Sequence, residues 1–537
     1  MSGASLRVVI VLDSFAVPAW TAQVISDIKA ADFAELVGVV TGEQVPCQPA
    51  SAPQKSSPLF ERYVAWDNSH NSSVFDPLSP VDLSSQLAGV PAVNWTTISA
   101  DVVLWLSSCT PVELSSEMAR FGVWFYQTGE PACFWELYDR QAVTSSCLIA
   151  LPGSGSSPTV IAKQFAATEM GWSLRKNRTV SYWKAPALIL KSLRQLQKGS
   201  DPSVQARDSG HFQSALSVIA GRAPSNAHPS NAQMMRFLAR NAARTIYRNT
   251  RYRKQEAYWF MAYRTNRERF VSQTNEFHAD GFTVIPAPKG HFYADPFILE
   301  RGGRNFIFFE DYPYREGKGV ISVLEISERG PVGEARRVLE RPYHLSYPFV
   351  FEHEGDTYMI PETLDARRIE LYRASHFPDR WELAAVLKEN VNAVDTTLWI
   401  ENGIFYFFTT IAERGTTPND FLYLFCADSL TGKWRPHPDN PLNYDVRSSR
   451  GAGKLFKRHG KLIRPAQDCS VRYGYACQLN EVKILSPNQY LEEPILRIEP
   501  TWARGLRGTH TINSNQWVEV IDGQIYRKKF RSHNYQE

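Results

Sequence analysis

The chain has 537 residues, of which 43% are hydrophobic and 21% charged, a composition typical of a soluble globular protein with two or three domains. Its formal net charge of +4 is too small to indicate a nucleic-acid partner by itself. The aromatic content of 12% favours strands and sugar-binding surfaces over helical bundles. The seven cysteines form no CxxC pair, so we expect reduced thiols rather than a disulfide framework or a zinc site.

The N-terminal segment MSGASLRVVIVLDSFAVPAW does not match a secretory signal peptide, because its apolar run is short and its one nearby basic residue is Arg7. No stretch of the chain approaches the ~18 apolar residues that a membrane-spanning helix needs. These two observations predict a cytoplasmic protein.

Residues 1–190 have the pattern of an α/β domain. Short, β-rich apolar segments at 7–12, 36–42 and 101–108 are predicted strands, and residues 17–32 are a predicted helix. Strands that alternate with helices favour a parallel sheet.

Residues 191–256 change character and are predicted to be a linker that contains a basic helix. The segments 199–210 and 221–233 are polar and rich in turn-forming residues. The helix predicted over 234–254 has four arginines spaced four apart, which places them on one face: Arg236, Arg240, Arg244 and Arg248. This face is either solvated or docked on acidic protein, or it makes peripheral contact with an anionic membrane. Nucleic acid has the least support.

Residues 257–537 contain a sequence repeat. The stretch YADPFILERGGRNFIFFED (293–311) aligns with SYPFVFEHEGDTYMIPET (346–363), and in both copies fifteen residues separate the first position from a glutamate. Three further copies start at intervals of about fifty residues and cover 394–410, 451–468 and 507–526. Strand–turn–strand repeats of this length predict an all-β propeller with five blades. The segment 257–264 is predicted to be the strand that completes the last blade.

In a propeller the innermost strands line a central channel, so equivalent positions of the copies should converge at one end of it. The first position is Asp295, Tyr347 and Asp395 in the first three copies, and it falls near Gly453 and His510 in the last two. The ends of the second strands add Glu310, Glu362 and the segment Arg464–Asp468. Carboxylates that are distant in sequence are therefore predicted to share one site.

Crowded carboxylates in a concave site raise one another's pKa, which separates an acid from a base as glycosidic chemistry requires. We predict Asp295, Glu362 and Asp395 as catalytic residues, although an aspartate at a strand start often only caps a turn. Tyr293, Tyr347 and Trp399 are candidates for stacking on sugars. Predicted substrate-binding residues are Tyr293, Glu310, His344, Tyr347, Arg447, Arg450, Arg464, Gln467, Asp468 and His510. No metal or cofactor is predicted, although His510 could bind a water or a cation as readily as it could be a core histidine.

The repeat region resembles the five-bladed propellers of the arabinanase, levansucrase and invertase superfamily through YADPFI (293–298). It resembles more closely the N-terminal domain of plant glucosamine inositolphosphorylceramide transferase and its bacterial relatives. The elements that carry this resemblance are HFYADPF, YHLSYPFVF, MIPET, VDTTLW, RPAQDCS and GTHTIN. The order of acids departs from the hydrolase pattern, because Tyr347 stands where the second blade carries an Asp. In the plant enzymes the transferase chemistry is attributed to a separate C-terminal domain.

The N-terminal part resembles the formyltransferase fold through RVVIVLDS, DVVLWLSS and residues 122–151. Formyltransferases carry an Asn-x-His element here, whereas this chain reads Phe125-Tyr126-Gln127-Thr128-Gly129, and the segment 152–160 offers no Asp. The resemblance therefore implies a non-catalytic formyltransferase-like domain that either binds a sugar or nucleotide or has no ligand.

Together these inferences predict a carbohydrate-active protein of glycan or glycolipid biosynthesis, which performs glycosyl transfer or hydrolysis on a carbohydrate, sugar-nucleotide or glycolipid substrate. The alternative is a non-catalytic glycan-binding or scaffold protein, since both domains depart from the catalytic patterns that they resemble. Carboxylates bound to arginines would favour this alternative.

Overall fold

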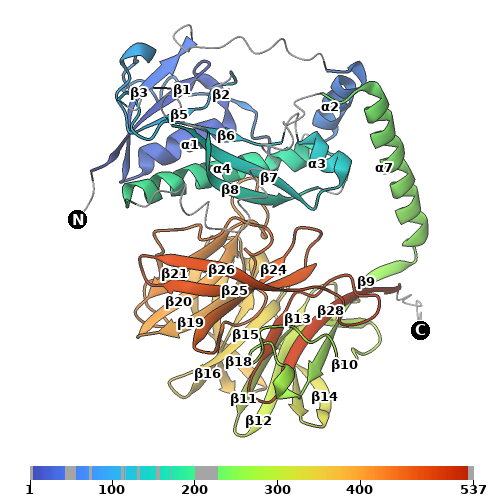
Figure 1. The fold of residues 1–537 in the computed structure, drawn as a ribbon. Coiled ribbons are helices and arrows are strands. Elements are labelled where there is room, and N and C mark those ends of the chain that lie inside the picture. The colour runs from blue at the N-terminus through green and yellow to red at the C-terminus, as the bar shows by residue number, and fades with distance from the viewer. Residues whose placement is uncertain are drawn as a thin grey trace. The chain divides into compact units, whose positions relative to one another are not determined.

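The computed structural model describes residues 4–42, 56–71, 75–109, 114, 117–129, 133–152, 158–169, 171–199 and 228–529 (Figure 1). The chain divides into two compact units, Met1–Arg244 with Arg414–Thr416, and Thr245–Glu413 with Thr417–Glu537. Most of the two polar segments predicted as linkers lies outside the described residues, and so does the 153–157 part of the segment 152–160.

The first unit is built on a six-stranded sheet of order β3-β1-β5-β6-β7-β8. Its strands are β1 (Leu6–Leu12), β3 (Ala34–Thr41), β5 (Val102–Trp105), β6 (Val123–Gln127), β7 (Val143–Leu151) and β8 (Thr159–Ala167). The strands predicted at 7–12, 36–42 and 101–108 are confirmed, and β1 pairs in parallel with β3 and β5. The sheet is mixed rather than wholly parallel, because β7 and β8 join it antiparallel. A short connection can join antiparallel strands, whereas a parallel pair needs a long crossover.

Four helices accompany this sheet among the described residues: α1 (Ala19–Ala30), α2 (Pro58–His70), α3 (Phe134–Asp139) and α4 (Leu174–Gln197). The helix predicted at 17–32 is α1. Helix α4 starts at the cap residue Ser173, whose side chain accepts a hydrogen bond from the backbone N–H of Lys176, and it continues past residue 190 to Gln197. The basic segment forms helix α7 (Asn231–Arg251). Two short strands, β2 (Ala16–Pro18) and β4 (Pro80–Asp82), form a separate pair.

The cysteines differ from the expectation at one position. Cys109 is disulfide-bonded, whereas Cys133, Cys147, Cys426, Cys469 and Cys477 are free and buried. Spacing along the chain does not report which sulfur atoms meet in space, so the sequence alone could not indicate this bond.

The second unit is the five-bladed propeller that the repeat predicted. It consists of five four-stranded sheets, one per blade. Blade one is β11 (His291–Arg301), β12 (Arg304–Pro313), β13 (Val320–Ser327) and β14 (Gly330–Leu339). Blade two is β15 (Ser346–His353), β16 (Asp356–Glu362), β17 (Arg368–His376) and β18 (Arg380–Glu389). Blade three is β19 (Ala393–Glu401), β20 (Ile404–Ile411), β21 (Leu422–Ala427) and β22 (Arg435–Pro436). Blade four is β23 (Phe456–Arg458), β24 (Lys461–Asp468), β25 (Ala476–Leu485) and β26 (Tyr490–Ile498).

Blade five combines the two ends of the propeller sequence. Its sheet has the order β10-β9-β28-β27, so β9 (Gln255–Arg264) and β10 (Thr283–Ile285) join β27 (Ile512–Ser514) and β28 (Glu519–Lys528). Strand β9 pairs antiparallel with β28 along its whole length, from Gln255 opposite Lys528 to Arg264 opposite Glu519. Figure 1 shows this pairing of the propeller's first strand, drawn in green, with its last, drawn in red. The strand predicted at 257–264 is therefore confirmed as the one that closes the ring.

The first three innermost strands share a backbone irregularity at the position where the repeats align. The pairing register shifts between Ala294 and Phe297, between Ser346 and Phe349, and between Val394 and Thr397. The residues inside these bulges, Asp295, Tyr347 and Asp395, all have positive φ, of 51°, 44° and 51°. A left-handed conformation is unfavourable for such residues, and it concentrates where a bulge redirects a side chain. The alignment of the first three copies is thus correct to the residue.

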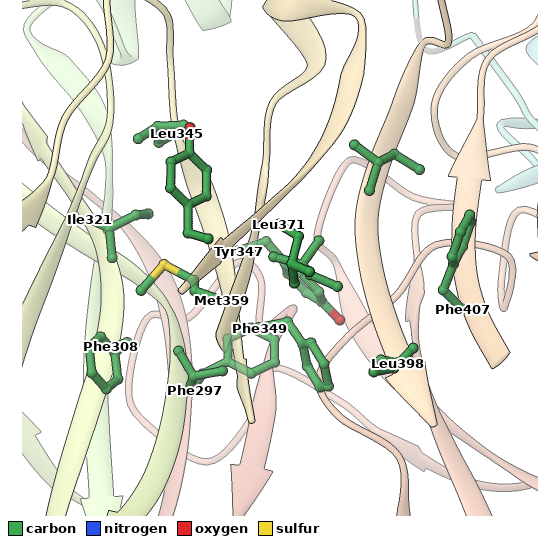
Figure 2. Packing of buried hydrophobic residues seen from close by; sticks show 14 of the residues in the cluster. Phe297, Phe308, Ile321, Leu345, Tyr347, Phe349, Met359, Leu371, Leu398 and Phe407 are labelled. Atoms are coloured by element: carbon green, nitrogen blue, oxygen red, sulfur yellow. The ribbon is translucent and has the colours of Figure 1, made fainter. Parts of the chain in front are cut away.

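Tyr347 packs at the centre of the ring. Its ring contacts Phe297 of blade one edge-to-face at 4.7 Å, and its hydroxyl accepts a hydrogen bond of 2.7 Å from the backbone N–H of Gly453. The side chain is fully buried in an apolar cluster that extends across blades one, two and three. Figure 2 shows Tyr347 in this cluster together with Phe297 and Phe349. Tyr347 therefore joins blades that are distant in sequence.

A buried ion pair at the ring closure leads to a stability prediction. Arg264 Nε donates to Glu519 Oε1 at 2.8 Å, and Glu519 Oε2 accepts from the backbone N–H of Val271 at 2.6 Å. Glu519→Ala leaves the Arg264 guanidinium buried without its partner, so we expect the free energy of unfolding to fall by about 3–5 kcal/mol. Denaturant titration of the full chain measures this change.

The matched control is Glu325→Ala, which breaks the exposed pair between Glu325 and Arg304 on neighbouring strands of blade one. Its expected cost is below about 1 kcal/mol, because solvent screens exposed charges. Equal losses in the two variants would contradict a special role for the buried pair.

Candidate functional site in the propeller

Five acidic side chains from four of the blades meet at the centre of the propeller. We call them, with the polar side chains that contact them, the central acid cluster: Asp295, Glu310, Glu362, Asp395, Asp522, Arg450, Gln467 and His510. The bulge residues Asp295 and Asp395 come from innermost strands. Glu310 and Glu362 lie one strand further out, opposite Ala294 and Ser346. All eight side chains are at least 90% buried.

Asp295 is held by groups from blades two and five. Its Oδ2 accepts from the backbone N–H of Tyr347 at 3.2 Å, and its Oδ1 accepts from the hydroxyl of Thr511 at 2.8 Å. Burial raises the pKa of Asp295 to about 6; the charge of His510 opposes this increase, and the charges of Asp395 and Asp522 add to it. Asp295 therefore titrates close to neutral pH, as a proton-transferring group requires.

His510 is fixed on three sides. Its Nδ1 lies 2.6 Å from Asp522 Oδ2 and 3.7 Å from Asp295 Oδ1, and its ring stacks on Trp259 with centroids 3.9 Å apart. Burial disfavours the charged imidazole, but Asp522 and then Asp295 outweigh this effect, so the pKa of His510 is raised above its ordinary value. A protonated His510 places a positive charge between the two aspartates.

Arg450 joins the acids of blades two and three. Its Nε donates to Asp395 Oδ2 at 2.6 Å, and one terminal nitrogen lies 3.3 Å from Glu362 Oε2. Gln467 donates a further hydrogen bond of 2.9 Å to Asp395 Oδ2. Burial, and next the charge of Asp395, raise the pKa of Glu362 well above its usual range, although Arg450 opposes both. The neutral form of Glu362 is therefore favoured, while Asp395 accepts hydrogen bonds from Arg450 and Gln467.

Glu310 lies beside His344 from the loop before blade two. His344 Nε2 is 3.4 Å from Glu310 Oε1, and its Nδ1 accepts a hydrogen bond from the backbone N–H of Gly319 at 2.8 Å. Because Nδ1 accepts, the proton of the neutral ring is on Nε2 and faces Glu310. Burial and the charges of Asp295 and Glu362 raise the pKa of Glu310 well above its ordinary value. Burial also lowers the pKa of His344.

The charge balance explains these shifts. The cluster holds five acids against two basic side chains, Arg450 and His510. Five buried negative charges would repel strongly, and the raised pKa values of Glu310 and Glu362 favour their neutral forms. The cluster thus combines three carboxyls of raised pKa, Asp295, Glu310 and Glu362, with two basic side chains in one buried site.

Three residues of the cluster have donor atoms close enough to hold a metal ion. Ligand atoms of Asp295, His510 and Asp522 all lie within 4.8 Å of one another. A cation there would compete with the hydrogen bond between His510 and Asp522, and protonated His510 already supplies a positive charge to both aspartates. In this structure the three residues therefore form one aspartate–histidine–aspartate group, in which His510 lies between the two carboxyls.

Several predicted substrate-binding residues lie outside the cluster. Tyr293 is buried against Phe309, with ring centroids 4.5 Å apart. Arg447 makes a two-pronged ion pair with Asp445, and the fully buried Arg464 makes one with Glu492. Each of these side chains is engaged within its own loop or blade, which the sequence did not indicate.

Three further predicted residues, Asp468, Tyr347 and Trp399, also lie outside the cluster or make contacts within the protein. Asp468 accepts from Arg497 at 2.9 Å and from the backbone N–H of Ser470 at 2.9 Å, and burial raises its pKa. Tyr347 is fully buried at the ring centre, and the Trp399 side chain packs with Lys457 and Glu401. Tyr347 therefore offers no ring face to a sugar in this structure, whereas Trp399 is half-buried.

Sequence reasoning missed three residues of the site. Asp522 lies on the second strand of blade five, where Glu310 and Glu362 lie in blades one and two, but a shorter hairpin hid this equivalence. Trp259 belongs to β9, which precedes every repeat. Tyr473 lies in the loop after β24, 43% exposed; the Arg450 guanidinium is 4.8 Å from its ring centroid, and the His510 ring meets it edge-on at 5.4 Å. Aligning strand ends instead of turns could have found Asp522.

Part of the chain is similar to known proteins. Residues 283–524 match the family model described as glucosamine inositolphosphorylceramide transferase 1, N-terminal. The matched residues contain every member of the central acid cluster.

Curated relatives with the same name also match the chain. The protein from Oryza sativa subsp. japonica is 34% identical over 248 residues, which cover 43% of this chain and 33% of the relative. The protein from Arabidopsis thaliana is 30% identical over 248 residues, which cover 43% of this chain and 32% of the relative. The chain thus spans about a third of the length of the curated relatives that it matches.

Among solved structures, the glycoside hydrolase family 43 enzyme of Xanthomonas citri has a TM-score of 0.34 at 12% identity, covering 45% of this chain and 89% of its own. The family 117 glycoside hydrolase of Zobellia galactanivorans has a TM-score of 0.31 at 12% identity, covering 50% of this chain and 90% of its own. Scores this low assign neither fold nor function to this chain.

The pKa of Asp295 leads to a prediction about stability and pH. Its value is about 6 in the folded chain and about 3.9 in an unfolded one, so the native state binds more protons between these pH values. The free energy of unfolding should therefore fall as the pH rises from about 4 to about 6, with Asp295 contributing about 3 kcal/mol of the change. Asp295→Asn removes this contribution. Denaturant titrations of both proteins from pH 4 to pH 8 should show the variant gaining about 3 kcal/mol relative to wild type. A constant difference across this window would contradict the raised pKa.

Proposed function

We propose that this protein acts on a carbohydrate or glycolipid at the central acid cluster, by glycosyl transfer or hydrolysis. One observation carries the proposal: Glu362, with a raised pKa, lies beside Asp395, and both contact Arg450. An acid and a carboxylate in one site are the groups that glycosidic chemistry uses. The similarity to glucosamine inositolphosphorylceramide transferases supports a glycan or glycolipid substrate.

The proposed roles follow from the protonation states. Glu362 donates a proton to the leaving oxygen, because burial raises the pKa of its carboxyl and favours the protonated form. Asp295 accepts a proton or attacks the sugar, since it titrates near pH 6 and lies beside the cationic His510. Asp395, held by Arg450 and Gln467, stabilises positive charge that develops on the sugar ring.

The second candidate function is glycan binding without catalysis. It is favoured by Arg450, which engages Glu362 and Asp395 together and would have to release one of them for chemistry. The two candidates differ in one measurable outcome, because binding without turnover supports the second alone.

We also propose that the N-terminal unit is a non-catalytic domain with the formyltransferase-like fold. Its parallel strands β1, β5 and β6 end at Leu12, Trp105 and Gln127, and no histidine occurs among the described residues that directly follow these strands. Thr128, at the position of the formyltransferase element, is buried and accepts a hydrogen bond from Ser146 at 3.0 Å. The cytoplasmic location inferred from the sequence stays a prediction.

Substitution of the acids tests the proposed chemistry. A thermal-shift screen of the full chain against sugar nucleotides and glycans first finds a ligand, which raises the melting temperature if it binds the native state. With that ligand, Asp295→Asn, Glu362→Gln and Asp395→Asn should each lower kcat by about 10²–10⁴-fold while binding persists. Glu401→Gln is the control, because Glu401 pairs with Lys457 in the same propeller but outside the cluster. Full turnover by Asp295→Asn would remove this residue from the mechanism.

Tyr473 is the exposed aromatic residue of the site, and we expect it to stack on a bound sugar. Tyr473→Ala should weaken binding of the screened ligand by about 3- to 10-fold, since an aromatic contact contributes about 0.5–1.5 kcal/mol. Tyr473→Phe should bind almost as wild type. Neither change should lower the melting temperature without ligand, because the side chain is 43% exposed. Equal binding by the Ala and Phe variants would exclude the stacking role.

A further inference from the structure

Helix α7 has two unusual surface features that the site in the propeller does not use. The first is charge: its sequence contains five arginines and no acidic residue, and four of these arginines are Arg236, Arg240, Arg248 and Arg251, all exposed. The fifth is Arg244, which is half-buried. None of the five forms an ion pair with another described residue. The positive charge of this face is therefore not neutralised within the described chain.

Arg140, which follows helix α3, adds to this positive surface. Burial, and next the charges of Arg240 and Arg244, lower the pKa of Arg140 below its ordinary value. Arg240 also lies over the ring of Tyr138, with its guanidinium 5.8 Å from the ring centroid. Three arginines that repel one another at the surface form a place where an anion is stabilised.

The second feature is an apolar stripe on the side of the helix that faces away from most of the arginines. Met235, Ala239, Ala242 and Ile246 are spaced i, i+4, i+7 and i+11, so they follow one side of the helix, and all four are exposed. Met235 is 60% exposed, Ile246 65% and the neighbouring Tyr247 56%. The opposite side of the helix is the one that packs on protein, through Met234 and Phe237. The described residues therefore cover Met234 and Phe237 but leave the apolar stripe exposed.

We propose that α7 is a membrane-surface helix, which binds an anionic lipid bilayer with the apolar stripe inserted at the interface, while the positive charge of the arginine side attracts the helix to the anionic headgroups. Exposed apolar residues on one side of a helix and uncompensated arginines on the other are the pattern of helices that lie in the interface plane. Charge complementarity favours anionic lipid, and the stripe favours a bilayer over nucleic acid, which would contact the arginines alone. No helix in the described part of the chain is long and apolar enough to cross a bilayer, so α7 lies along the surface.

Vesicle co-sedimentation of the full chain tests this inference without any sugar substrate. We expect binding to vesicles of phosphatidylcholine with phosphatidylserine, little binding to phosphatidylcholine alone, and a decrease as salt is added. The variant Arg236→Gln with Arg240→Gln, Arg244→Gln and Arg248→Gln should bind several hundred-fold more weakly, at about fivefold per arginine. Met235→Ser with Ile246→Ser should also bind more weakly while its salt dependence is unchanged.

The matched control replaces four exposed propeller arginines that form no ion pair, Arg315, Arg329, Arg380 and Arg504, by glutamine. It changes the net charge by the same amount and should bind as wild type. Equal loss in this control would show an effect of overall charge and overturn the proposal. The proposal is also overturned if wild type ignores anionic vesicles or binds an RNA oligonucleotide in preference to them. Circular dichroism confirms that each variant keeps its fold.

Discussion

The pairing of β9 with β28 is the interaction on which the rest of the propeller depends. It joins the strand that precedes the first repeat to the strand that ends the last one, along ten residue pairs from Gln255 opposite Lys528 to Arg264 opposite Glu519. The pairing lies inside blade five, so one four-stranded sheet is assembled from both ends of the propeller sequence. Closure also places blade five beside blade one. The contacts of Asp295 with Thr511 and His510 exist only because the two ends meet there.

The second constraint is electrostatic. The ring centre collects five acids and two basic side chains in a region that is almost closed to solvent. Such a cluster is costly unless charges are paired or protonated, and the structure uses both means. Arg450 and His510 each bind two acids, while Glu310 and Glu362 have raised pKa values. Burying this many charged groups costs more than apolar packing would, and the proposed function rests on this unusual concentration of charge.

Backbone strain occurs at residues that line or support the central acid cluster. Asp295, Tyr347 and Asp395 adopt left-handed conformations at equivalent positions, and each turns its side chain toward the ring centre. Two of these residues carry charge, and the third fills the space between blades. The same bulge therefore positions a charged side chain in blades one and three and a packed aromatic ring in blade two. The surface of α7 is a separate feature, because none of its residues belongs to the central acid cluster.

The sequence by itself determined the propeller, its blade number and the equivalence of Asp295, Tyr347 and Asp395, because a repeat reports strand order and register through spacing alone. It also identified most of the acids, since Glu310 and Glu362 end aligned second strands. Only the tertiary structure decided which neighbours these acids have. Arg450 binds Asp395 whereas Arg447 and Arg464 bind other acids, and nothing in their spacing distinguishes the three arginines. The structure also decided the positions of Asp522, Trp259 and Tyr473. Asp522 lies on a shorter hairpin, ring closure brings in Trp259, and a loop places Tyr473. Local sequence does not encode distances across a closed ring.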